Sequence, residues 1–184
     1  MAIRSNHYEA AFEAYIRSIR VPCVAVDEAK RTLTDEGGLK SPDFLLYPRC
    51  GPNLVVEVKG KKGKDARGRR PWENWVTTDD LDGLARWQEM FGPGFRAILA
   101  FAYAEVTGEF ALPRDDGSFP FRGLAYRFWA VGLDDYLQHL RSRGPAWKAV
   151  AMARAAFRLR VRPLDEWLPM SPLSPPRPRP VPGA

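Results

Sequence analysis

Two short apolar runs separated by a turn-rich segment limit the fold of this chain more than any other feature. The runs, residues 42–47 and 54–59, are rich in β-branched, aromatic and leucine side chains, and Pro48, Gly51 and Pro52 lie between them. This pattern predicts a β-hairpin. The second run is apolar almost throughout, as expected for a strand that is buried on both faces. The Glu and the Lys near its end therefore need a specific explanation.

The charged residues of this hairpin predict a metal site. Glu57 and Lys59 are two positions apart, so their side chains leave the strand on the same face. If Asp43 pairs opposite Glu57, its carboxyl joins them, whereas a slip of one residue would turn it to the other face. Two neighbouring carboxyls repel unless a cation holds them. Because Mg²⁺ takes oxygen ligands, generally one or two carboxylates with several waters, we predict a Mg²⁺ site, with Mn²⁺ as the alternative ion.

The same residues supply the parts for hydrolysis of a phosphodiester. The carboxyls of Asp43 and Glu57 and the main-chain carbonyl of Val58 are the predicted metal ligands. A metal-bound water can lose a proton and attack phosphorus. Lys59 can orient that water or neutralise the charge that develops on the phosphate.

Helical and strand patterns flank the hairpin on both sides. Residues 5–19 carry apolar side chains at three- and four-residue steps, which predicts an amphipathic helix. A second helix is predicted from Thr77 or Thr78 to about Phe91, and Thr77 with Asp80 resembles a capping box. Residues 21–26 and 97–103 are predicted strands. The charged residues 27–40, between the first of these strands and the hairpin, are a predicted loop.

The last third of the chain gives weaker signals. Residues 119–121 and 125–131 predict strands around a turn, residues 133–143 predict a helix, and residues 147–160 fit either a strand or a helix. We expect one domain over residues 1–170. The proline-rich residues 171–184 are expected to be disordered or in polyproline II conformation.

Composition and charge limit the function further. The chain has 184 residues and a net charge of +6, which favours binding to phosphate polymers. The positive charge is concentrated in residues 59–70. There we expect either a solvated loop or contacts to backbone phosphates from Lys61, Lys62, Lys64, Arg67, Arg69 and Arg70. Two cysteines and two isolated histidines argue against a zinc site. No membrane segment or secretion signal is recognisable, so a cytoplasmic location is expected.

Pro42-Asp43 followed by Glu57-Val58-Lys59 resembles the PD-(D/E)xK signature of the restriction-endonuclease-like nuclease superfamily. The resemblance extends over about residues 5–103. It implies an α/β fold with a central mixed sheet flanked by helices, in the order αβββαβ. The sequence around residues 6–13 is also similar to the start of small bacterial proteins of this superfamily.

Two further candidate site residues follow from the resemblance. Archaeal Holliday-junction resolvases of this superfamily carry an active-site Glu on the first helix, which implies Glu13, with Glu9 as the second choice. Gln88 resembles a helical Gln that some members place near the metal. The alternatives are ordinary exposed helix charges for the two glutamates and a polar helix position for Gln88.

The sequence as a whole predicts a Mg²⁺-dependent nuclease acting on DNA, of a structure-specific or repair type. One alternative is a nucleic-acid-binding module of the same fold without catalysis. Another is a protein-interaction scaffold that uses the proline-rich tail. Trp72 and Trp75 could stack on unpaired bases or belong to the core. Cutting two strands calls for two sites, which a homodimer would supply, although nothing in the sequence locates an interface.

Overall fold

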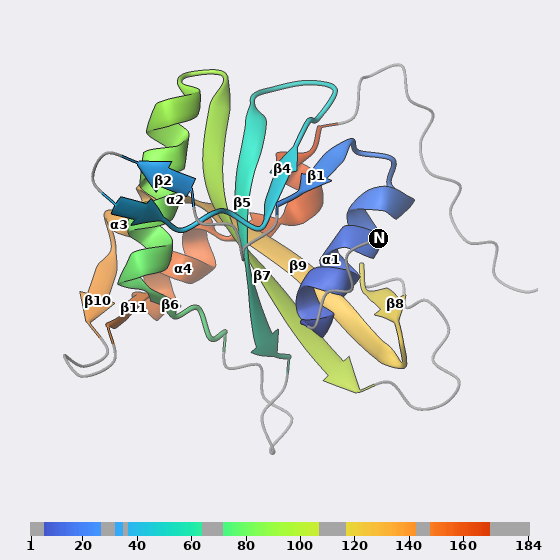
Figure 1. Ribbon diagram of the computed structural model, residues 1–184. Helices are drawn as coiled ribbons and strands as arrows, with labels where there is room; N and C mark the ends of the chain where they lie inside the picture. The colour runs from blue at the N-terminus through green and yellow to red at the C-terminus, as the bar shows by residue number, and fades with distance from the viewer. Residues whose placement is uncertain are drawn as a thin grey trace, which may run out of the picture.

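The computed structural model describes residues 6–26, 32–34, 37–63, 72–106, 117–142 and 148–169. The chain begins with helix α1, His7–Ser18, which lies across one face of the central sheet (Figure 1). The side chain of Asn6 caps this helix by accepting from the N–H of Tyr8 at 3.1 Å. The apolar stripe of α1, which includes Phe12 and Ile16, is fully buried against the sheet. This burial fixes α1 on the sheet.

The central sheet is mixed and curled. Its strands run in the order β1 (Cys23–Ala25), β4 (Phe44–Leu46), β5 (Asn53–Lys62), β7 (Phe95–Val106), β9 (Leu124–Gly132) and β12 (Arg162–Pro163), with β8 (Phe119–Phe121) paired to β9. Only β5 and β7 are parallel neighbours among these pairs. A parallel pair needs a crossover, and helix α2, Thr78–Phe91, provides it.

The opposite face of the sheet carries α2, the short helix α3 (Leu133–Leu137) and α4 (Arg154–Arg160). Two apolar clusters result, one on each face. On β5, Val56 and Val58 belong to the cluster under α1, whereas Val55 belongs to the cluster under α2. Because side chains alternate along a strand, Glu57 and Lys59 lie on the α2 face.

The predicted hairpin is confirmed, with the expected register. Phe44 pairs with Val56 and Leu45 with Val55, which is the register on which the predicted pairing of Asp43 with Glu57 is based. The N–H of Asp43 donates to the carbonyl of Val56 at 3.0 Å, so Asp43 and Phe44 both face Val56, and the backbone of Asp43 is shifted by one residue from the predicted partner Glu57.

The predicted fold class is also confirmed. The order α1, β1, β4, β5, α2, β7 is the predicted αβββαβ, with helices on both faces of a mixed sheet. In the described residues, no helix has both the length and the apolar character needed to span a membrane.

Three local predictions need correction. Within the predicted loop of residues 27–40 lie β2 (Thr32–Thr34) and β3 (Gly37–Leu39), which pair with each other. The predicted helix of residues 133–143 ends at Leu137, because β10 (Leu140–Ser142) pairs with β11 (Ala149–Met152). The ambiguous residues 147–160 include both β11 and α4. Strand β6, Val76–Thr77, joins β11 in a small sheet.

Candidate active site

Glu57 and Lys59 lie where β5 passes the first turn of α2. The Glu57 side chain is buried, with 3% of the residue exposed, and its Oε1 lies 2.8 Å from the Nζ of Lys59. Burying an acid in this way is costly unless charged partners compensate. The two-residue spacing therefore brings the acid and the lysine together on one face, as predicted.

Asp43 approaches the same part of β5 from the neighbouring strand. It is 3% exposed, and its Oδ2 accepts a hydrogen bond from the N–H of Val58 at 2.6 Å. The carbonyl of Val56 points toward β4, because it accepts a hydrogen bond from the N–H of Asp43. Backbone groups two residues apart point to the same side of a strand. The carbonyl of Val58 is therefore directed to the side of β5 on which Asp43 lies.

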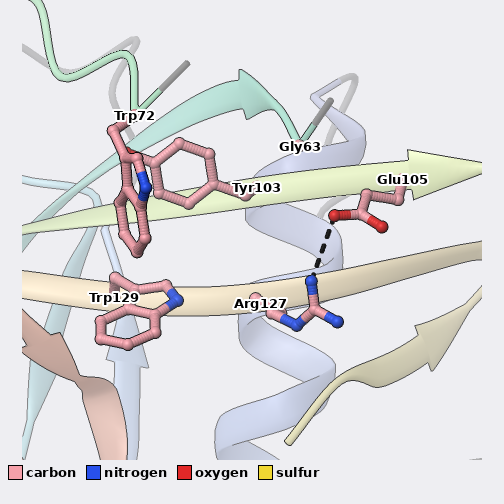
Figure 2. Close-up of a pocket in the computed structure, with 6 residues that line it drawn as sticks. All are labelled: Gly63, Trp72, Tyr103, Glu105, Arg127 and Trp129. Carbon is pink, nitrogen blue, oxygen red and sulfur yellow. Dashed lines mark hydrogen bonds and ion pairs between the residues drawn. The ribbon is translucent and has the colours of Figure 1, made fainter. Parts of the chain in front are cut away.

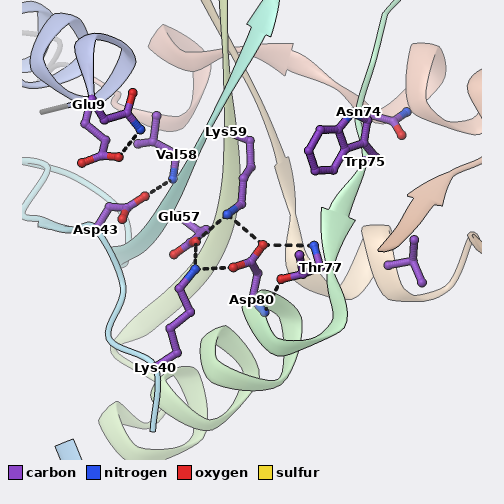
Figure 3. Close-up of polar contacts among 12 residues, drawn as sticks. Glu9, Lys40, Asp43, Glu57, Val58, Lys59, Asn74, Trp75, Thr77 and Asp80 are labelled. Carbon is purple, nitrogen blue, oxygen red and sulfur yellow. Dashed lines mark hydrogen bonds and ion pairs between the residues drawn. The ribbon is translucent and has the colours of Figure 1, made fainter. Parts of the chain in front are cut away.

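Two residues outside the predicted set complete a network of charges around Glu57 (Figure 3). The Nζ of Lys40 lies 2.7 Å from Glu57 Oε1 and also contacts Asp80 Oδ1. The other oxygen of Asp80 lies 2.8 Å from the Nζ of Lys59. Each of the two lysines therefore binds both Glu57 and Asp80.

Asp80 has a second task at the start of α2. Its Oδ2 accepts from the N–H of Thr77 at 3.0 Å, and its own N–H donates to Thr77 Oγ1 at 3.2 Å. This is the capping box that the sequence predicts. The helix N-terminus favours a negative charge at this position.

These contacts shift the ionisation of the four groups. Burial alone would raise the pKa of Asp80, but the ammonium groups of Lys59 and Lys40 outweigh it and hold that pKa well below its ordinary value. Burial opposes the charged form of both lysines, yet Glu57 and Asp80 raise the pKa of each above its ordinary value. The pKa of Glu57 is raised, because burial outweighs the attraction of Lys59 and Lys40.

The atoms near Asp43 that are proposed as metal ligands are all oxygens. In the described part of the chain, no three His, Cys, Asp or Glu side chains form a group that could hold a metal by themselves. Two carboxylates and one carbonyl are nevertheless a suitable donor set for a hard ion that retains several waters. Cys23 and Cys50 are not in a disulfide, and neither belongs to this set. The residues present therefore fit Mg²⁺ or Mn²⁺ better than Zn²⁺.

Helix α1 presents Glu9, rather than Glu13, toward these residues. Glu9 is 8% exposed and its carboxyl accepts from the side chain of Asn6. In Figure 3 it lies on the side of Asp43 and Val58. Glu13 instead forms an ion pair with Arg17 at 2.7 Å, one turn along the helix. The order of preference between the two glutamates is thus the reverse of the predicted one.

Gln88 does not reach the site. Its Oε1 accepts from the N–H of Ala97 at 2.6 Å, near the start of β7. Gln88 is eight residues beyond Asp80 on α2, which corresponds to about 12 Å along the helix axis. The side chain serves to satisfy the backbone of β7, so its predicted place beside the metal is wrong.

The basic residues divide into three groups. Lys61 is on β5, is 4% exposed and donates from Nζ to the carbonyl of Trp75 at 2.8 Å, so it is not a surface contact for phosphate. Lys62, the last residue of β5, is exposed. The other predicted phosphate contacts, Lys64, Arg67, Arg69 and Arg70, lie outside the described residues, as does the tail of residues 171–184.

Sequence reasoning missed Lys40 and the charged role of Asp80. A signal for Asp80 was present, because a capping box with Asp in place of Glu puts a second acid close to a predicted active-site lysine. Lys40 offered no comparable signal, since its contacts depend on how the chain enters β4 after the β2–β3 hairpin.

Comparisons with known proteins support the fold. No protein-family model and no curated protein sequence matches this chain. Among solved structures, the chain is similar to the Holliday junction resolvase Hjc from Archaeoglobus fulgidus, an archaeal hyperthermophile. The TM-score is 0.52 and the sequence identity is 15%, and the match covers 89% of this chain and 98% of the resolvase chain. The protein therefore has a mixed α/β fold like that of a Holliday junction resolvase.

Proposed function

We propose that this protein is a metal-dependent nuclease of the PD-(D/E)xK type that hydrolyses phosphodiester bonds in structured DNA. The observation that carries the proposal is the pair Asp43 and Glu57, buried on neighbouring strands with Lys59 on the same face as Glu57. The fold in which this pair occurs is similar to that of a Holliday junction resolvase. Branched DNA is therefore the first substrate class to test.

In this proposal the metal is Mg²⁺, or Mn²⁺ in its place. Asp43, Glu57 and the carbonyl of Val58 would hold the ion, and Glu9 would bind one of its waters from the other side of β5. When bound, the ion would lower the pKa of a water and stabilise negative charge on the phosphate. A divalent ion near Glu57 would also compete with Lys40 for the carboxylate.

Lys59 has the properties required of a group that stabilises a charged transition state. Its ammonium is fixed by two carboxylates, Glu57 and Asp80, at 2.8 Å each. Their charge raises its pKa, which keeps the side chain protonated at neutral pH. A preorganised charge in a partly buried site stabilises developing negative charge more effectively than a mobile surface lysine.

Substrate binding would use the basic end of β5. Lys62 is exposed there, and the following residues include Lys64, Arg67, Arg69 and Arg70. Contacts of this kind position a nucleic acid without reading its sequence. A homodimer would supply a second active site for a second strand.

The experiment is cleavage of end-labelled DNA substrates by the full chain in Mg²⁺ or Mn²⁺. The substrates are a duplex, a single strand, a flap and a four-way junction of related sequence. Glu57→Gln is the inactive variant, and Glu166→Gln, which changes an exposed acid on the 3₁₀ helix Leu164–Trp167, is the matched control. We expect cleavage that chelation and Glu57→Gln both abolish and that Glu166→Gln leaves unchanged.

Two other results would contradict the proposal. Cleavage that persists in Glu57→Gln would point to a contaminating nuclease. Salt-sensitive DNA binding without any cleavage would instead favour the alternative of a nucleic-acid-binding module that retains the fold.

A further inference from the structure

The segment 72–75, between the described end of β5 and strand β6, is irregular but firmly held. Buried side chains of β5, β7 and α3 donate to three successive carbonyls. Tyr103 Oη donates to Glu73 at 2.8 Å, Tyr136 Oη to Asn74 at 2.6 Å, and Lys61 Nζ to Trp75 at 2.8 Å. Buried hydrogen bonds of this kind restrict the backbone to one position.

The side chain of Asn74 fastens the segment from the other side. Its Oδ1 accepts from the N–H of Met152 at 3.1 Å, and its Nδ2 donates to the carbonyl of Met152 at 3.2 Å. Asn74 is itself 5% exposed. Five hydrogen bonds to buried groups therefore hold a segment that belongs to neither a helix nor a strand.

The two tryptophans of this segment have different surroundings. Trp72 packs on the sheet, with its ring centroid 5.2 Å from that of Trp129 and 5.8 Å from that of Tyr103. Figure 2 shows it next to Tyr103 and Trp129, with the ion pair between Glu105 and Arg127 farther along the same two strands, β7 and β9. Trp72 is thus a packing residue, which decides between the two alternatives that the sequence left open for it.

Trp75 is instead presented to solvent. It is 37% exposed, and it is the one aromatic residue among the large exposed hydrophobic side chains of the described chain. The Nζ of Lys61 lies 3.4 Å from the centroid of its ring. Because the same ammonium binds the carbonyl of Trp75, ring and backbone are fixed by one buried lysine.

The position of this ring is beside the candidate active site. Lys61 follows Lys59 by two residues on the same face of β5, which is about 7 Å along the strand. Trp75 also directly precedes β6, which leads into the capping box of α2. Figure 3 draws Trp75 on the segment that leads into α2, to the right of Lys59. One nucleotide is long enough to connect a phosphate at Lys59 with a base at Trp75.

We propose that Trp75 is a stacking platform for an unpaired nucleobase next to the cleaved phosphate. The substrate class is therefore DNA with an unpaired or splayed nucleotide at the cleavage position, and this inference rests on the proposed nuclease function. Every base has a π-face that can stack on an indole ring. In a continuous duplex the neighbouring base pairs cover that face, so a paired base must first leave the stack.

The fixed backbone of residues 72–75 would increase the affinity of Trp75 for an unpaired base. A ring that is already held in place loses little conformational freedom when a base stacks on it. The ammonium of Lys61 covers one face of the indole, which directs the base to the rest of the exposed ring.

The test measures DNA binding by the full chain in EDTA, so that no cleavage is required. The probes are two duplexes of equal length containing 2-aminopurine, one with that base unpaired in a single-nucleotide bulge and one with it fully paired. A dye at the far end reports the Kd by anisotropy, and 2-aminopurine fluorescence reports stacking. The variants are Trp75→Ala and Trp75→Phe, and Leu159→Ala changes a distant side chain that is 84% exposed.

We expect Trp75→Ala to weaken binding of the bulged duplex by about 5- to 150-fold. The fluorescence change on binding should be lost, and binding of the paired duplex should change less than twofold. Trp75→Phe should retain most of the affinity because a smaller ring still stacks. Leu159→Ala should match the wild-type protein. Circular dichroism checks that each variant is folded.

Several outcomes would overturn the platform. These are equal affinity of wild-type protein for both duplexes, an unchanged Kd in Trp75→Ala, or an equal loss for both duplexes in a folded variant. If the wild-type protein nevertheless cuts DNA in Mg²⁺, the nuclease proposal stands and the platform fails. If it shows the expected binding without cleavage, the platform stands and the nuclease proposal fails.

Discussion

The Nζ of Lys59 lies 2.8 Å from Oδ2 of Asp80, and this contact joins strand β5 to the first turn of helix α2. The same carboxylate oxygen accepts from the N–H of Thr77 at 3.0 Å. One oxygen therefore both closes the helix N-terminus and holds the lysine. As a consequence, the position of the Lys59 ammonium depends on where α2 begins.

Asp80→Asn should impair catalysis more than substrate binding. The amide can still accept from Thr77, but it cannot neutralise Lys40 and Lys59, which are partly buried. We expect the free energy of unfolding to fall by about 1–3 kcal/mol. We also expect kcat for DNA cleavage to fall by about 10-fold or more with little change in KM, because Lys59 acts mainly on the transition state. Urea unfolding and steady-state cleavage measure the two effects.

Thr77→Ala separates the two tasks of Asp80. This variant removes the Oγ1 that accepts from the N–H of Asp80 at 3.2 Å, but it leaves the contacts to both lysines. Loss of a cap costs about 1 kcal/mol of stability. We expect kcat to stay within twofold of the wild-type value. Equal losses of kcat in the two variants would mean that Asp80 acts only through the helix start.

The stability of the protein should depend on Asp80 in acid. The lysines hold the folded-state pKa of Asp80 below its ordinary value of 3.8. A depressed pKa contributes stability that is present above the ordinary value and is lost as the pH falls through the folded-state value. The wild-type protein should therefore lose more stability below about pH 4 than Asp80→Asn does.

Urea unfolding at a series of pH values between about 6 and 2.5 tests this dependence. Glu57 has the opposite effect on stability in acid. Burial raises its pKa in the folded protein, so protonation removes the cost of burying its charge. Comparing the wild-type protein with Asp80→Asn reduces this contribution, since both contain Glu57. Parallel curves for the two proteins would show that Asp80 carries no net stabilising charge interaction.

The hairpin and its register could be predicted because local patterns determine them. The turn residues between the two runs and the burial of Leu54 and Val56 leave one register in which apolar side chains point inward. The common face of Glu57 and Lys59 then follows from the two-residue period of a strand, and Asp43 lies at the start of the partner strand. Lys40 could not be predicted in this way, because it lies outside the paired strands, directly after the β2–β3 hairpin, and it meets Glu57 17 positions further along the chain.

The basic residues after Lys59 illustrate a different limit. Charge and glycine content predicted a loop, but pairing with β7 extends β5 as far as Lys62. The alternation of the strand then buries Lys61 and exposes Lys62. A propensity for loops was thus overridden by a neighbouring strand, and this is the kind of tertiary effect that a single sequence does not contain.

Gly60 should be required for the packing of α1 on β5. A Cβ at this position would lie 2.1 Å from Cδ2 of Tyr8, so the ring and the helix turn that carries it would have to move. We expect Gly60→Ala to lower the free energy of unfolding by about 1–3 kcal/mol. Cleavage should also weaken, since Glu9 directly follows Tyr8. Urea unfolding and cleavage assays measure both effects.

Gly94→Ala is the matched control. A Cβ at Gly94 would meet nothing within 4 Å. Its φ is outside the left-handed region, so alanine is expected to be neutral or to stabilise by up to about 1 kcal/mol. If Gly60→Ala were as stable as Gly94→Ala, the contact between Tyr8 and β5 would not limit the packing of α1.

The two glutamates of α1 should differ in their effect on catalysis. They are four residues apart and share one side of the helix, so periodicity alone could not choose between them. Glu9 is buried near Asp43 and Val58, whereas Glu13 pairs with the exposed Arg17. Glu9→Gln should therefore lower single-turnover cleavage by about 10-fold or more and raise the Mg²⁺ concentration needed for half-maximal rate. Glu13→Gln should remain within twofold, because an exposed i,i+4 pair contributes only about 0.3–0.5 kcal/mol. A larger loss in Glu13→Gln would instead mean that Glu13 leaves Arg17 and turns toward the metal when DNA binds.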